Sequence, residues 1–306
     1  MKIAAFNGFL FHDEMFGYII YFCKKYNHEL TLFCHTEVYN HYVEFYKKHF
    51  KGYYFNVIDM RLFDQFKYGF DCIFLMTDID QNFKDNNEYI NSITIRIDHY
   101  DIIRRENISK FIATRPFENN YRKWALPCYP IYYSADKYYN LKENKVINLM
   151  ILGICKVKYD FSIIHRLKPQ TDSKMIITVV SRELSPDKFV GYNKKWDIHL
   201  YEHISAMDLM ELFKTTNFIL TDSVNDDYYE QNCMSGSIPA AFSTLTTLII
   251  SKQTNKYYNF KNVIEFDKES TDPILLKEAN LYELEKEREE LISTFSTITL
   301  DYLKSF

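Results

Sequence analysis

The sequence predicts an α/β protein built from two successive parallel-sheet domains and a final helix. Short apolar runs alternate with longer amphipathic runs, which is typical of parallel strands joined by helices. This alternation starts afresh after the polar stretch at residues 138–144. A length of 306 residues suits two domains of roughly 150 residues each. We therefore expect domains over residues 1–140 and 141–280, followed by a long charged helix over 281–306.

The first half contains apolar runs short enough to be strands and two amphipathic runs long enough to be helices. The expected strands cover residues 2–6, 30–34, 54–58, 71–76, 93–97 and 108–114, and the expected helices cover 14–26 and 38–49.

The second half repeats the pattern, with local signals that limit two of its helices. Pro169 is expected to stop a helix over 161–167, because proline lacks the N–H that a helix interior requires. Ser205, with Asp208 three residues later, predicts the start of a helix over 206–215 in the manner of a capping box. The remaining expected elements are strands at 146–152, 174–181, 198–201, 218–221, 247–250 and 263–266, and a helix at 238–244.

Composition excludes several classes of protein. A hydrophobic fraction of 47% and a charged fraction of 25% are typical of a globular protein. The net charge of −4 lacks the basic character of a nucleic-acid-binding protein. Six widely separated cysteines form no CxxC pair, so we expect neither a disulfide scaffold nor a zinc site. No apolar run approaches the roughly 18–20 residues of a membrane span. We expect a cytoplasmic protein.

The segment Ser235–Gly236–Ser237 lies between an expected strand and an expected helix. Small residues at a helix start leave backbone N–H groups accessible to an anion, and glycine allows close approach. A diphosphate fits such a site. The alternative is an ordinary loop with a serine cap.

Longer stretches around this segment carry a family resemblance. "YYEQNCMSGSIPAAFS" and the later "LIISKQTNKYYNFKNVIEF" resemble the donor half of GT-B glycosyltransferases, and more narrowly uncharacterised glycosyltransferases of large DNA viruses and algae. "FHDEMFGYI", "CIFLMTDID" and "KWALPCYPIYY" extend the resemblance along the chain. It implies two Rossmann-like domains facing across a cleft, with the C-terminal helix packing back across them.

The resemblance also implies a donor site in the second domain and an acceptor side in the first. The donor-binding residues implied are Gly153, Lys156, Arg182, Glu183, His203, Ser205, Glu230, Ser235, Gly236 and Ser237. The alternative to donor binding is a surface ion pair for Arg182 and Glu183, and a structural role for His203.

Retaining members of the family commonly carry Glu-x7-Glu, with the second glutamate just after the glycine loop. Ala240 occupies that position here, and the suitably spaced Asp222 and Glu230 lie upstream of the loop. This departure favours an inverting reaction.

An inverting transfer needs a general base for the acceptor hydroxyl. His12, Asp13 and Glu14 follow the first strand, and the carboxyl ends of parallel strands face the ligand crevice. A histidine beside carboxylates suits this role. The alternative is a helix start whose acidic residues complement the helix dipole.

Asp78 and Asp80 end the apolar strand "CIFLM", and His99 ends the next strand. We expect the three on the acceptor side, although a surface position is an equal alternative for His99. An Asp-x-Asp pair also resembles the metal site of GT-A glycosyltransferases. A divalent metal is not favoured, because the phosphate loop lies in the other domain.

The resemblance implies transfer of a sugar from a UDP- or GDP-sugar to a hydroxyl of a glycan or protein, without a tightly bound cofactor. The donor and the acceptor are the expected partners, and nucleic acid is not. A nucleotide-sugar epimerase on the same fold and a non-catalytic nucleotide- or sugar-binding module remain alternatives.

Overall fold

A computed structural model describes most of the chain, in two compact units. The described residues are 1–9, 15–76, 87–99, 108–116, 123–131, 146–153, 161–170, 172–181, 184, 196–221 and 234–306, apart from the side chains of 36–41 and 161. One unit comprises Met1–Tyr129 with Glu290–Phe306, and the other comprises Pro130–Glu289.

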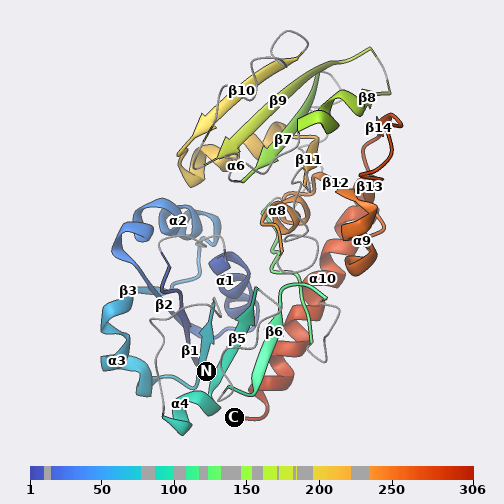
Figure 1. The fold of residues 1–306 in the computed structure, drawn as a ribbon. Coiled ribbons are helices and arrows are strands. Elements are labelled where there is room, and N and C mark those ends of the chain that lie inside the picture. Colours follow the sequence, from blue (N-terminus) through green and yellow to red (C-terminus); the bar gives the residue numbers. More distant parts are fainter. Residues whose placement is uncertain are drawn as a thin grey trace. The chain divides into compact units, whose positions relative to one another are not determined.

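The N-terminal unit contains a six-stranded parallel sheet of order β3-β2-β1-β4-β5-β6 (Figure 1). Its central strands are apolar and buried on both faces, as is usual for parallel sheets covered by helices. The strands are β1 (Lys2–Phe6), β2 (Glu29–Cys34), β3 (Asn56–Asp59), β4 (Cys72–Leu75), β5 (Thr94–Asp98) and β6 (Lys110–Ala113). The described α-helices are α1 (Phe16–Lys25), α2 (Thr36–His49), α3 (Phe63–Phe66) and α4 (Glu88–Ser92), with 3₁₀ turns η2 (Met60–Leu62) and η3 (Lys67–Gly69).

The C-terminal unit repeats this order in a second parallel sheet, β10-β9-β7-β11-β12-β13. The strands are β7 (Val146–Leu152), β9 (Lys174–Ser181), β10 (Asp197–Glu202), β11 (Phe218–Leu220), β12 (Thr247–Ser251) and β13 (Val263–Phe266). The helices include α6 (Ala206–Thr215), α8 (Ser237–Ser243) and α9 (Lys252–Tyr258), with a 3₁₀ segment η4 (Phe161–Arg166). A separate two-stranded sheet pairs β8 (Leu167–Pro169) with β14 (Ile274–Leu276).

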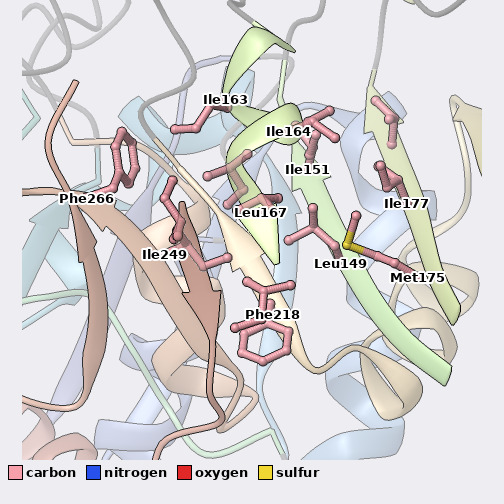
Figure 2. Packing of buried hydrophobic residues seen from close by; sticks show 14 residues of the cluster. Leu149, Ile151, Ile163, Ile164, Leu167, Met175, Ile177, Phe218, Ile249 and Phe266 are labelled. Carbon is pink, nitrogen blue, oxygen red and sulfur yellow. The ribbon is translucent and has the colours of Figure 1, made fainter. Parts of the chain in front are cut away.

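One face of the second sheet carries the core of its unit (Figure 2). Leu149, Ile151 and Ile177 from β7 and β9 meet η4 residues Ile163 and Ile164, and all five are at most 6% exposed. The 3₁₀ segment η4 is therefore held against the sheet by apolar burial.

The strands expected in both sheets are confirmed. One expected helix is wrong, and several short elements were not expected. Residues 161–167 are not an α-helix: 161–166 form 3₁₀ turns, and Pro169 lies in β8. A two-stranded sheet has only edge strands, where the missing proline N–H is tolerated. Strand β14 was not expected, because three apolar residues give too short a pattern. Helices α3, α4 and α9, of four, five and seven residues, were also not expected.

Helix α10 (Leu281–Leu303) contributes to both units. In its first half, Glu287 accepts hydrogen bonds from the backbone N–H groups of Lys261 and Asn262, at 2.9 and 3.0 Å. In its second half, the Phe295 ring lies 4.7 Å from the ring of Tyr18 in α1. Tyr302 donates a hydrogen bond to the Phe111 carbonyl oxygen at 3.0 Å.

A charged pair is buried in the N-terminal sheet. The Arg96 guanidinium donates to both carboxylate oxygens of Asp98, two residues further along β5. The side chains are 1% and 0% exposed, and the Arg96 guanidinium also lies 5.6 Å from the centre of the Phe111 ring. Neither residue was singled out from the sequence. Residues two positions apart in a strand lie on the same face of the sheet, so opposite charges at Arg96 and Asp98 were a signal that the two side chains could pair.

Candidate ligand site at the strand ends

The strand order places a topological switch point in the C-terminal sheet. Strands β7 and β11 are neighbours, with Ile151 opposite Leu220. The chain leaves β7 to build one side of the sheet through β9 and β10, and then builds the other side from β11. Open α/β sheets bind ligands outside the carboxyl ends of the strands at such a point. The ends of β7 and β11 therefore define the candidate site.

The serine-glycine loop is attached to this point. The Ser237 hydroxyl donates to Thr221 Oγ1 at 2.9 Å, and the hydroxyls of Ser235 and Ser237 are 2.6 Å apart. Thr221 follows β11 directly, and its N–H donates to the Ile249 carbonyl oxygen at 3.0 Å. Ser237 and Thr221 are each only 3% exposed. These bonds hold the loop at the carboxyl end of β11.

Sequence reasoning did not single out Thr221, which it treated as the last residue of a strand. The available signal was a hydroxyl residue at the end of an apolar run. Because Thr221 and Ser237 are 16 residues apart, only the tertiary structure shows that their hydroxyls meet.

The start of α8 offers fewer N–H groups than the sequence suggested. The N–H of Ile238 donates to the Ser235 carbonyl oxygen at 3.1 Å, and Pro239 has none. Gly236 is the N-cap, with φ −61° and ψ −19° and no side-chain cap. No heavy atom of the described residues lies within 4 Å of an added Gly236 Cβ, apart from its chain neighbours. The space over Gly236, more than the dipole of a seven-residue helix, makes this loop accessible to a ligand.

Two other expected donor residues lie at the same sheet edge. Gly153 follows β7 with φ +131°, a backbone conformation that side-chain-bearing residues rarely adopt. Its N–H donates to the Val180 carbonyl oxygen at 3.1 Å. His203 follows β10 with φ +53°, and its N–H donates to the Ser181 carbonyl oxygen at 3.2 Å. The His203 side chain is exposed.

Ser205 caps α6 as expected. Its hydroxyl oxygen accepts from the Asp208 N–H at 3.1 Å. We expect Ser205→Ala to lower the free energy of unfolding by about 1 kcal/mol, because one helix N–H loses its partner. Ser293→Ala, at an exposed position inside α10, should stay within about 0.5 kcal/mol of the parent. Urea denaturation followed by circular dichroism measures both, and equal losses would contradict a capping role.

Several expected site residues lie outside the described part of the chain. These are His12, Asp13, Glu14, Asp78, Asp80, Lys156, Arg182, Glu183 and Glu230.

The N-terminal sheet has a switch point of its own between β1 and β4, where Phe6 pairs with Leu75. His99 is 6% exposed, and its Nε2 donates to the Met76 carbonyl oxygen at 2.9 Å. The surface alternative for His99 is therefore wrong, because a backbone carbonyl group at the end of β4 holds its ring inside. The structure brings His99 to the strand end that leads toward Asp78.

The chain that leaves β1 is also anchored. Asn7 is fully buried, its N–H donates to the Phe33 carbonyl oxygen at 2.9 Å, and its Oδ1 accepts from the Phe9 N–H at 3.2 Å. His35 Nε2 donates to the Gly8 carbonyl oxygen at 2.8 Å. The segment that precedes His12 is thus held at the carboxyl edge of this sheet.

The described residues contain neither a candidate metal cluster nor a membrane-spanning helix. No three or more His, Cys, Asp or Glu residues are grouped so that they could hold a metal ion. None of the described helices combines the length and the apolar character needed to cross a membrane.

Two solved structures are similar in fold to this chain over almost its whole length. AviGT4, a glycosyltransferase involved in avilamycin A biosynthesis, is 10% identical with a TM-score of 0.58, over 99% of this chain and 96% of its own. An α-glucosyltransferase in complex with UDP and a 13-mer DNA containing an HMU base is 11% identical with a TM-score of 0.53, over 99% of this chain and 94% of its own. The fold is GT-B-like.

No protein-family model and no curated protein matches the sequence. The GT-B-like fold agrees with the fold that the sequence resemblance implied, in each of its two parallel sheets. The narrower likeness to viral and algal enzymes stays a prediction.

Proposed function

We propose that the chain is a glycosyltransferase that moves a sugar from a nucleotide-sugar donor to a hydroxyl group. The observation that carries this proposal is the GT-B-like fold over 99% of the chain, shared with two structures named as glycosyltransferases. The family-like stretches around Ser235–Gly236–Ser237 support it from the sequence.

The donor is proposed to bind at the switch point of the C-terminal unit. There Gly153 and Gly236 carry no side chain, so the backbone can approach a diphosphate closely. Lys156, Arg182, Glu183, His203, Ser205 and Glu230 complete the proposed donor set. UDP is bound by the similar α-glucosyltransferase, so a UDP-sugar is the first donor to test and a GDP-sugar the second.

The proposed reaction is an inverting displacement. The acceptor oxygen bonds to the anomeric carbon, the bond from that carbon to the diphosphate breaks, and the nucleoside diphosphate leaves with the electron pair. The acceptor proton passes to a general base, for which His12 with Asp13 and Glu14 is proposed. Asp78, Asp80 and His99 are assigned to the acceptor side. The acceptor is a glycan or protein hydroxyl.

A screen of nucleotides and nucleotide sugars tests the proposal first. A ligand at about 100 times its Kd stabilises the folded chain by about 2.7 kcal/mol, so UDP or GDP should raise the melting temperature. Transfer is then assayed by mass spectrometry with glycan and peptide acceptors, with and without EDTA. Turnover of the donor alone would instead indicate an epimerase, and binding without turnover would indicate a non-catalytic module. Activity lost in EDTA would overturn the metal-independent mechanism.

Gly236→Trp tests the location of the donor site. The backbone at Gly236 is helical, with φ −61°, and the space beyond it is open among the described residues. The indole should therefore leave the unliganded melting temperature unchanged and fill the proposed diphosphate position. We expect the stabilisation by UDP, about 2.7 kcal/mol at 100 Kd, to disappear.

Gly69→Trp is the matched control, because its added Cβ also meets no described atom within 4 Å and it lies in the N-terminal unit. It should keep the full UDP response. An unchanged UDP response in Gly236→Trp would place the nucleotide elsewhere.

A further inference from the structure

A recess opens at the amino-end edge of the N-terminal sheet. Its volume is about 680 Å³, within the usual range of ligand sites. The residues that line it lie next to the starts of β1, β4, β5 and β6 and at the end of α10. They include Asp71, Tyr89, Ser92, Lys110, Ser305 and Phe306. Because the strands are parallel, this edge is opposite the carboxyl edge at which Asn7 and His99 lie.

Aromatic side chains stand exposed around the recess. Tyr89 is 52% exposed and Phe306 is 39% exposed, although both belong to residue types that usually bury their rings. Tyr68, which does not line the recess, is 58% exposed, and its hydroxyl accepts from Asn87 Nδ2 at 3.0 Å. Asn87 in turn caps α4, the helix that carries Tyr89. The Tyr89 ring is thus attached to a capped helix and stays about half exposed to solvent.

The charged side chains that line the recess are Lys110 and Asp71, one of each sign. Lys110 Nζ donates to the Ser92 carbonyl oxygen at 2.6 Å and lies 4.2 Å from the centre of the Phe306 ring. Asp71 Oδ2 accepts from the Lys2 N–H at 2.7 Å. The Lys110 ammonium is thereby partly engaged, and the Asp71 carboxylate lines the same recess.

This combination discriminates between ligand classes. A phosphate or another anion would meet Asp71 as well as Lys110, so it would gain little from charge. A purely apolar ligand would displace the water around Asp71, Lys110 and Ser305. It could not replace the hydrogen bonds of that water, which costs free energy. A sugar ring has an apolar face for an aromatic side chain and hydroxyls for a carboxylate and an ammonium. An uncharged saccharide satisfies both kinds of lining.

We propose that this recess binds an uncharged saccharide, with a sugar ring stacked on Tyr89 and its hydroxyls bonded to Asp71 and Ser305. The site is separate from the transfer site proposed above. A strand of five residues at about 3.3 Å each places the two edges of the sheet roughly 15 Å apart. Saccharide binding here requires neither a nucleotide nor turnover, so the inference goes beyond the proposed function and does not depend on it.

Saturation-transfer NMR with cellotetraose, maltotetraose and tetra-N-acetylchitotetraose tests the proposal on the full chain. We expect at least one of them to bind, and binding to persist at saturating UDP. Tyr89→Ala should weaken that binding about ten-fold, the effect of losing an aromatic stacking partner. Tyr89→Phe keeps the ring and should bind as the parent does. Tyr54→Ala removes a 93% exposed tyrosine outside the recess and should change nothing.

A second variant protects the test against a folding defect. Ser305 is exposed and lines the recess, so Ser305→Arg should fill part of the recess, weaken saccharide binding and leave the melting temperature unchanged.

The proposal fails if no oligosaccharide binds, if UDP displaces the bound oligosaccharide, or if both Tyr89→Ala and Ser305→Arg bind as the parent does. It also fails if sedimentation velocity shows a dimer that Tyr89→Ala dissociates, since a second copy would then cover this face. Absence of a UDP response with saccharide binding intact would count only against the proposed transfer function.

Discussion

Asp98→Asn is expected to lower the free energy of unfolding by about 3–5 kcal/mol, the usual cost of breaking a buried ion pair from one side. Asp98 accepts two hydrogen bonds from the Arg96 guanidinium, and both side chains are at most 1% exposed. The asparagine amide retains the shape of the carboxylate and removes its charge. The buried guanidinium then keeps its desolvation cost without the carboxylate that offsets it.

Urea denaturation followed by circular dichroism measures this loss. Glu211→Gln is the control, because Glu211 pairs with Lys214 at 2.6 Å while the two side chains are 60% and 52% exposed. An exposed pair contributes about 0–1 kcal/mol. The double variant Arg96→Met/Asp98→Leu should recover part of the Asp98→Asn loss, because both charges leave the interior together. A loss in Asp98→Asn no larger than in Glu211→Gln would show that the pair is not isolated from solvent.

Replacing His12 or Glu14 with alanine is expected to abolish sugar transfer while nucleotide binding persists. Removing a positioned general base typically costs about 10²–10⁴-fold in rate. Strand β1 ends beside β4 at the switch point of the N-terminal sheet, and residues Asn7–Phe9 leave it in an anchored path. The described residues that lead to His12 are therefore held at the carboxyl edge of this sheet.

The kinetic measurement separates this role from a structural one. If His12 is the base, kcat falls in His12→Ala, the UDP-induced rise in melting temperature is unchanged, and the acidic limb of the pH profile for kcat is lost. His35→Ala is a matched control, because His35 contacts the same segment through the Gly8 carbonyl group. It should preserve the pH profile. Turnover in His12→Ala and Glu14→Ala equal to that of the parent would remove both residues from the mechanism.

The sequence by itself determined the strands of both sheets and the repeat of one plan in two units. Runs such as Lys2–Phe6 and Val146–Leu152 were assigned correctly, because a parallel strand covered on both faces is mostly apolar. The capped start of α6 at Ser205 followed from local chemistry alone, since its hydrogen bond spans three residues.

Only the tertiary structure decided which distant groups meet. The order of strands makes neighbours of β7 and β11, and the resulting edge unites Gly153, Thr221 and Ser237. In the N-terminal unit, the packing around the sheet buries Arg96 with Asp98, and the His99 ring lies inside, against the Met76 carbonyl group. Such contacts depend on how sheets and helices pack. Hydrophobic periodicity reports which face of an element is buried, and it carries no information about which element covers that face.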